Sequence, residues 1–91
     1  MNVKYNLSVS IIKEGDKYVV YSSALDLSTC GKNIAEAKKS FTEASQLFFE
    51  EIIADGTMKE ALSDLRWKHL KKQWTPPVIV SQDTQTICVP V

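Results

Sequence analysis

The segment NIAEAKKSFTEASQLFFEEIIADG, residues 33–56, sets the architecture of the chain. Asn33, followed by Glu36 three positions later, is the pattern of a helix N-cap and its capping-box partner. Apolar residues then recur at steps of four, three, four and four, at Ala37, Phe41, Ala44, Phe48 and Ile52. Gly56 stands where a helix C-terminal glycine belongs. The segment therefore predicts one long helix with one apolar face on a core.

The residues before this helix have the patterns of β-structure. Tyr5, Leu7, Val9 and Ile11 alternate with polar residues, which predicts a half-buried strand over residues 5–12. The polar turn 14–16 and the β-branched and aromatic run from Tyr18 to Tyr21 complete a β-hairpin. A shorter third strand is expected from Leu25 to Cys30, ended by Gly31. Three strands with short connections predict an antiparallel meander.

The residues after the helix contain a second capping pattern and two prolines. Thr57 with Glu60 predicts a shorter helix that reaches Leu65 or Arg66. Residues 67–74 fit either an extension of that helix or an irregular connector. Pro76 and Pro77 stop any helix. Two short strands, Val78–Val80 and Thr86–Val89, are expected around the polar turn 81–85. The order is β-β-β-α-(α)-β-β, an α+β domain over residues 1–91 with a mainly antiparallel sheet and one long helix on a face.

The charge balance of the chain bears on the class of partner. The 91 residues include 11 Lys and Arg and 11 Asp and Glu, a net charge of zero, and nucleic-acid binders usually have a basic excess. The balance is uneven, because residues 1–56 carry six basic and eight acidic residues and residues 57–91 carry five and three. No signal peptide and no membrane span of about 20 apolar residues is recognisable, so we expect a cytoplasmic protein. Cys30 and Cys88 are expected to be reduced and buried in strands.

Residues 21–37, YSSALDLSTCGKNIAEA, resemble the signature of the HicB antitoxin family. The preceding hairpin, the Phe-Phe-Glu-Glu helix end at residues 48–51 and the Pro-Pro segment before a short last strand fit the same family. The resemblance covers nearly the whole chain and implies a partial ribonuclease-H-like core. Ser23 stands where the family has a proline, and Asn33 replaces the usual Thr cap. The C-terminal DNA-binding domain of many members is missing, which argues against direct DNA binding.

The resemblance implies a function in a toxin–antitoxin system. The protein would be a non-catalytic antitoxin that binds a small, basic HicA-type toxin, an mRNA-cleaving ribonuclease, and occludes its active surface. We expect it to self-associate as a dimer or tetramer. The alternative is a solo regulatory or RNA-associated oligomeric domain with no toxin partner.

Enzymatic activity is not expected. Two-metal nucleases need several converging carboxylates, and residues 5–12 and the last two predicted strands contain none. Ser63, Asp64 and His69 do not make a nucleophilic triad, because neighbouring residues point apart on a helix. We therefore expect no catalytic residue, cofactor or metal ligand, and a relic nuclease is the third hypothesis.

Exposed aromatic and acidic side chains are the candidate binding residues. The predicted partner-binding set is Tyr18, Tyr21, Asp26, Glu50, Glu51, Trp67 and Trp74. The two acidic residues at the helix end suit a basic partner. The two Trp residues lie among Arg66, Lys68, His69, Lys71 and Lys72, which fits either a contact with nucleic acid or a solvated connector with both Trp residues against the core. Phe49, roughly opposite the apolar stripe, is the predicted self-association residue.

Overall fold

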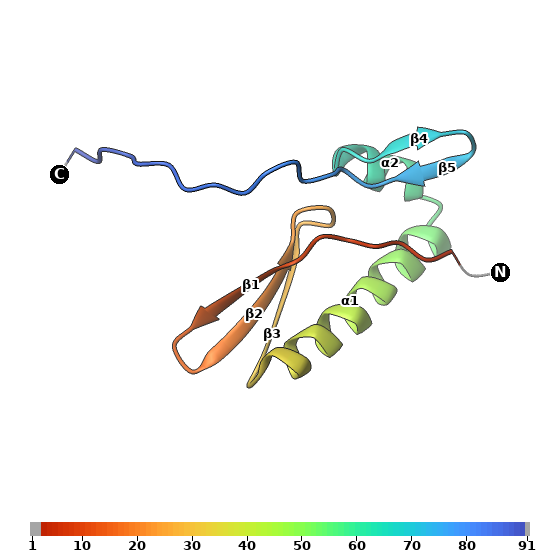
Figure 1. The fold of residues 1–91 in the computed structure, drawn as a ribbon. Helices are drawn as coiled ribbons and strands as arrows, with labels where there is room; N and C mark the ends of the chain where they lie inside the picture. Colours follow the sequence, from red (N-terminus) through yellow and green to blue (C-terminus); the bar gives the residue numbers. More distant parts are fainter. Residues whose placement is uncertain (1–2, 91) are drawn as a thin grey trace.

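A three-stranded antiparallel sheet and one long helix form the body of the protein (Figure 1). The structure is a computed structural model that describes residues 3–90. Its elements are β1 (Ser10–Glu14), β2 (Lys17–Ser22), β3 (Leu27–Gly31), α1 (Ile34–Ala54), α2 (Met58–Asp64), β4 (Lys68–Leu70) and β5 (Gln73–Thr75). The sheet order is β1-β2-β3, and β4 and β5 form a separate hairpin. The α+β class, the meander and the long helix are thereby confirmed.

The helix α1 begins and ends as its sequence predicts. The Oδ1 atom of Asn33 accepts a hydrogen bond from the Glu36 backbone N–H at 2.7 Å. Gly56 has a φ of 69°, and the Thr57 N–H donates to the Ile52 carbonyl at 2.9 Å, the pattern of a glycine-ended helix. The helix α2 does begin after Thr57, but the Thr57 side chain makes no capping hydrogen bond.

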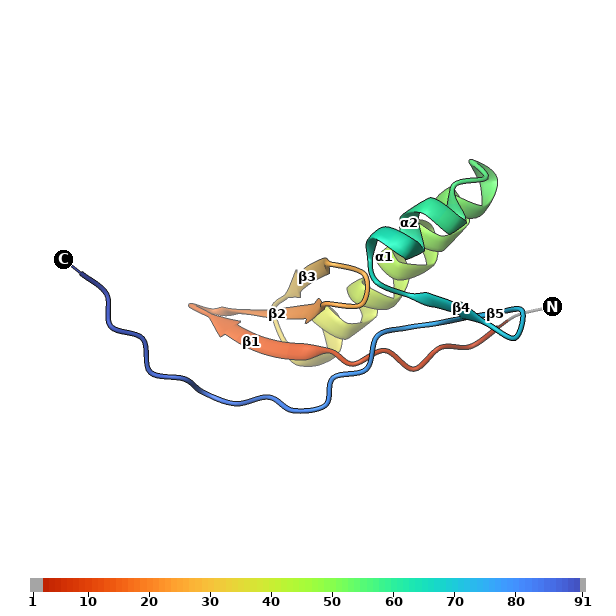
Figure 2. The same cartoon turned by 90° about the horizontal axis from the view of Figure 1, so that it is seen from above.

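The register of the sheet decides which side chains face α1. Ile11 pairs with Val20, which pairs with Thr29, so these three residues share one face. Val20 is buried, and the Thr29 hydroxyl donates to the Ala37 carbonyl of α1 at 3.0 Å. Seen from above, α1 lies over β2 and β3 and leaves β1 aside (Figure 2). The helix-facing side of β1 is therefore open.

The core joins the sheet, both helices and the start of the β4–β5 hairpin. Its buried members are Val20, Ala24, Leu25, Ala37, Phe41, Ile52, Leu62 and Trp67. The indole N–H of Trp67 donates to the Ala24 carbonyl at 2.7 Å, in the loop between β2 and β3. This buried bond attaches the second half of the chain to the sheet.

The structure corrects the predicted first strand and the 67–74 region. The strand β1 begins at Ser10 rather than Tyr5, because β2 ends at Ser22, opposite residue 9, and offers no partner farther on. Residues 68–75 are neither helix nor irregular connector but the hairpin β4–β5. Lys71 and Lys72 form its two-residue turn with φ values of 49° and 63°, which the sequence does not signal because Asn and Gly are the usual residues there.

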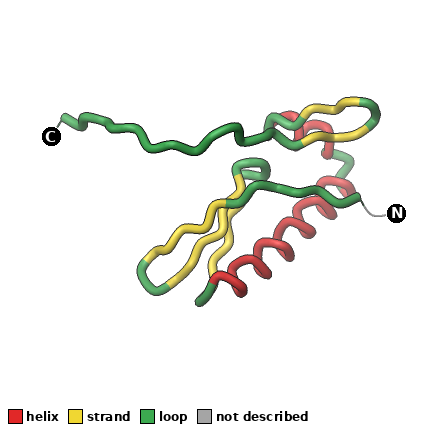
Figure 3. Tube along the Cα trace, in the orientation of Figure 1, coloured by secondary structure: helices red, strands yellow, loops and turns green. Residues whose placement is uncertain are grey.

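The two strands predicted after the prolines are absent, because residues 76–90 form no strand in the structure. They run as an extended segment away from the body (Figures 1 and 3). The radius of gyration is 15.6 Å, against about 12 Å for a compact chain of this length. Cys30 and Cys88 are exposed, which contradicts their predicted burial, since no element covers the outer face of the sheet and Cys88 lies outside any strand.

Candidate partner-binding surface

An open groove of about 1090 Å³ lies between α1 and the extended residues 3–9. It exists because α1 packs on β3 and β2 rather than on β1. Val9 and Ile11 consequently remain 37% and 41% exposed on the open inner side of the sheet. The flank of α1 that faces this space presents Lys38, Thr42 and Ser45 near the helix start and Phe49 and Ile53 near its end. Val20 and Phe41 also line the groove near the helix start, so its lining is mixed there, and the end at Phe49 and Ile53, where Lys4 lies in the other wall, is its more apolar end.

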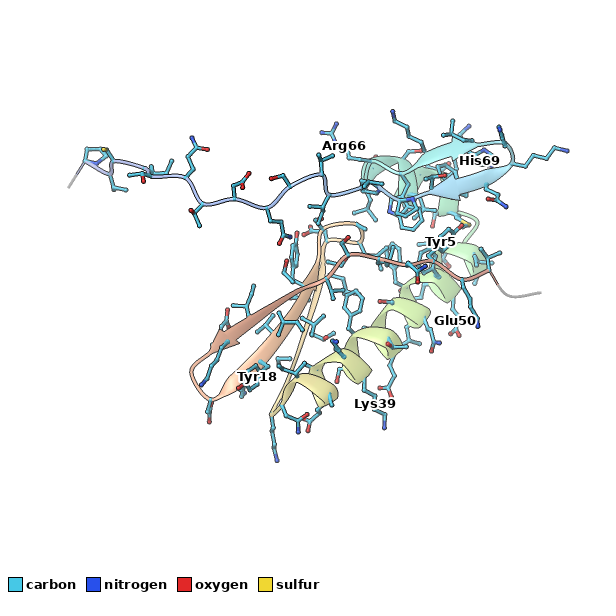
Figure 4. The ribbon with its side chains drawn as sticks, in the orientation of Figure 1. Tyr5, Tyr18, Lys39, Glu50, Arg66 and His69 are labelled. Atoms are coloured by element: carbon cyan, nitrogen blue, oxygen red, sulfur yellow. The ribbon has the colours of Figure 1, made fainter. Side chains whose placement is uncertain are left out.

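An aromatic cluster closes the apolar end of the groove. The ring of Tyr5 stacks on Phe49 with centroids 6.1 Å apart and meets Trp67 edge-on at 5.1 Å. Figure 4 shows Tyr5 lying between the 3–9 segment and the β4–β5 end of the molecule. Phe49 is half-buried on the side of the apolar stripe, not opposite it, because it packs on its own chain. Phe49 also lines the groove, and its role in self-association stays a prediction.

The end of α1 is acidic and adjoins the groove. Residues 43–55 contain Glu43, Glu50, Glu51 and Asp55 and no basic residue. Glu50 lines the groove and projects from the helix, and Glu51 is exposed (Figure 4). The partial negative charge of a helix C-terminus disfavours carboxylates there, so this surface does not arise from helix stability. The apolar end of the groove therefore has an acidic rim.

The predicted tyrosines lie on opposite faces of β2 and do not form one site. Tyr18 pairs with Lys13 across the inner face, where the Lys13 Nζ atom lies 5.9 Å from the ring centroid. The Tyr21 hydroxyl, on the outer face, donates to Asp26 Oδ1 at 3.1 Å. This bond and the nearby negative charge raise the pKa of Tyr21 above its ordinary value of 10.0. Tyr21 at the end of β2 and Asp26 in the β2–β3 loop are thus a local pair.

The two Trp residues have different environments. Trp67 is 3% exposed, so it belongs to the core and does not fit its predicted role as a partner-binding residue. The backbone of Arg66 has a φ of 72° and turns the chain at the end of α2. Because of this turn, the Trp67 N–H donates to the Leu62 carbonyl at 2.9 Å, which positions Trp67. Trp74 is half-buried and stacks on His69, its cross-strand partner, with centroids 4.8 Å apart. Only Trp74 remains available to a partner.

The hairpin β4–β5 carries a second candidate surface. Four exposed cations lie in or beside the hairpin that carries the His69–Trp74 stack, namely Arg66, Lys68, Lys71 and Lys72. Arg66 and His69 lie at the same end of the molecule, on the side of the 3–9 segment away from α1 (Figure 4). The basic hairpin and the acidic end of α1 are therefore separate surfaces.

Two further observations concern the residues that the structure describes. No three of their His, Cys, Asp and Glu side chains come close enough to hold a metal ion. None of their helices is both long enough and apolar enough to cross a bilayer.

The comparisons with known proteins give no family and no neighbour. The chain matches no family model, no curated protein and no solved structure. The geometry of the groove, the acidic helix end and the basic hairpin therefore has to support any functional proposal.

Proposed function

We propose that the chain is a non-catalytic, HicB-like antitoxin domain that binds a small basic HicA-type ribonuclease and occludes its active surface. The observation that carries this proposal is the acidic end of α1 beside the apolar end of the groove. An apolar concavity with a charged rim is the usual anatomy of a protein-binding surface. The acidic rim selects a basic partner, such as a ribonuclease that binds the phosphates of RNA.

The fold is compatible with this proposal. The three antiparallel strands and the long helix have the order that we expected, whereas the short last strand of the resemblance is absent from residues 76–90. We propose that these first elements are the partial ribonuclease-H-like core. The proposal includes a cytoplasmic location and self-association.

The groove and its rim would contribute to binding in different ways. Tyr5, Phe49 and Ile53 offer apolar and aromatic area, which provides most of the energy of a buried contact. Glu50 and Glu51 lie in solvent, so their charges mainly raise the association rate. Neutralisation would thus follow from steric cover of the toxin, with no bond made or broken.

Co-expression with the product of the neighbouring small open reading frame tests the proposal, which requires that product to be a basic toxin. The antitoxin should restore growth, and the double variant Glu50→Lys, Glu51→Lys should bind the toxin more slowly at low salt. The matched control reverses two exposed charges at the end of β1 and in the turn after it, Glu14→Lys and Asp16→Lys. A neighbour that is harmless, or a helix variant that binds as fast as the control, would refute the proposal.

The second candidate function is an RNA-associated domain with no toxin partner. The observation in its favour is the basic hairpin with the stacked His69–Trp74 pair, because cations and an aromatic face are what single-stranded RNA contacts. Lys71→Asn with Lys72→Asn removes two charges and keeps residues that tolerate the positive φ of the turn.

A salt titration with fluorescent single-stranded RNA tests this second function. The hairpin variant should weaken binding and lower the slope of log K against log salt by about two. The control variant Lys38→Gln, Lys39→Gln on α1 should leave the slope unchanged. If the wild-type protein binds no single-stranded RNA at low salt, the RNA-associated function is refuted.

A further inference from the structure

One long sheet edge has no partner among the described residues. The strand β1 pairs with β2 on one side only. Residues 3–9 continue it in an extended conformation, and within the described part of the chain their backbone makes no hydrogen bond of its own. Ile11 and Ile12, on opposite faces of β1, are both more than two-fifths exposed. Such an edge is a template for an added strand.

The 76–90 segment has the composition of a strand but no partner. Its Val80 is 95% exposed, and Ile87 and Val89 are each 69% exposed. Its two apolar runs, 78–80 and 86–89, consist mostly of β-branched residues, which favour extended pairing. Asp83 is the one charged residue between Pro76 and Pro90, and the Ser81 hydroxyl donates to it at 2.6 Å between the two runs. The segment therefore presents unpaired backbone and apolar surface together.

The course of the segment leaves its strand-forming residues free for another copy of the chain. Pro76 and Pro77 have fixed φ angles, and the segment runs from the hairpin past its own sheet without pairing with it and continues beyond it (Figures 1 and 2). Residues 78–89 and residues 3–14 are equal in number, so both span about 40 Å at roughly 3.3 Å per residue.

We propose that residues 78–89 of a second copy add strands to the 3–14 edge, and that two copies exchange these segments reciprocally. A reciprocal exchange closes a two-fold dimer and leaves neither segment exposed. It satisfies backbone groups on both partners and places Val80 and Ile87, on opposite faces of the added strand, beside the edge of the other copy's sheet. This inference rests on the self-association in the proposed function and names the segments that make it, and it does not depend on a toxin, so either part can fail without the other.

The mass of the full chain in solution is the first test. Light scattering after size exclusion should give twice the chain mass of 10.2 kDa. Val80→Asp with Ile87→Asp should reduce it to 10.2 kDa with an unchanged far-ultraviolet spectrum, because these side chains are exposed within one copy. The control Gln82→Asp with Gln85→Asp adds the same charge to the same segment and should stay dimeric. A monomeric wild type, or a dimer that both pairs of substitutions leave intact, overturns the proposal.

Cross-linking between two labelled chains distinguishes exchange from closure within one chain. One chain carries Cys30→Ser, Cys88→Ser and either Lys4→Cys or Lys13→Cys, at the two ends of the edge. The other carries Cys30→Ser, keeps Cys88 and has a tag of different mass. After the chains refold together, a bismaleimide should link them into a mixed dimer. A control chain with Lys39→Cys on α1, in place of the cysteine at the edge, should give no such link.

A third chain provides the outcome that counts against exchange. It keeps Cys88 together with the edge cysteine in the Cys30→Ser background. A cross-link that forms only within this chain, at monomer mass, shows that the segment folds back on its own sheet and overturns the proposal.

Discussion

The substitution Trp67→Phe tests the bond that attaches the second half of the chain to the sheet. The indole N–H donates to the Ala24 carbonyl at 2.7 Å, and both residues are buried. Phenylalanine keeps an aromatic ring but has no donor, so the carbonyl is left without its partner. Leaving a buried acceptor unpaired costs about 1–3 kcal/mol.

The smaller ring adds a packing loss. Phenylalanine lacks two of the indole carbons, worth about 1.6 kcal/mol at ~0.8 kcal/mol for each buried carbon. The total is about 3–5 kcal/mol, against an expected stability of about 5–14 kcal/mol for a domain of this length. The midpoint of thermal unfolding should fall by about 12 °C or more.

Urea unfolding followed by far-ultraviolet circular dichroism is the assay, because the substitution itself alters the fluorescence. Trp74→Phe is the matched control, since Trp74 is half-buried and its indole donates no hydrogen bond within the described residues. The control should lose about 1 kcal/mol or less. The reasoning is wrong if Trp67→Phe loses no more free energy of unfolding than Trp74→Phe.

Three further predictions concern single contacts. Gly31→Ala should destabilise the protein in urea by about 1–3 kcal/mol, because the added Cβ would lie 2.5 Å from a backbone nitrogen of α1; an unchanged midpoint contradicts the close packing of β3 on α1. Asn33→Ala should cost about 1 kcal/mol in the same assay, whereas Thr57→Ala should change little because Thr57 makes no side-chain cap; equal losses would show that the cap is unimportant. Asp26→Gly, which tolerates the positive φ of that position, should lower the raised pKa of Tyr21 towards 10.0 in a resolved tyrosine titration, and an unmoved midpoint excludes the hydrogen bond as the cause. Because the raised pKa favours the neutral phenol in the folded state, the stability from this bond is present below pH 10 and is lost as the pH rises through the folded-state pKa of Tyr21.

The candidate surface followed from the sequence only in part. Glu50 and Glu51 were predicted from their place at the end of an amphipathic helix. Both are exposed, and Glu50 lines the groove. Tyr5 was seen only as one member of an alternating strand pattern. Its contact with Phe49 and Trp67 joins segments far apart in the chain, and no local pattern reports such contacts.

The basic hairpin shows a different limit of sequence reasoning. Residues 67–74 gave neither the Asn-Gly signal of a tight turn nor a clear strand pattern. The turn at Lys71 and Lys72 holds two non-glycine residues at positive φ, and Trp67 holds the start of the hairpin on the core. Tertiary packing therefore selected a backbone that local propensity disfavours.

The local elements were fixed by residues within a few positions of one another. Asn33 and Gly56 bound α1 because capping is a contact between near neighbours, and the period of the apolar residues chose which face is buried. The tertiary structure alone decided what depends on distant partners. Residues 5–9 and 78–89 have strand composition, but a strand exists only where another strand completes its hydrogen bonds, and among residues 3–90 neither segment finds one.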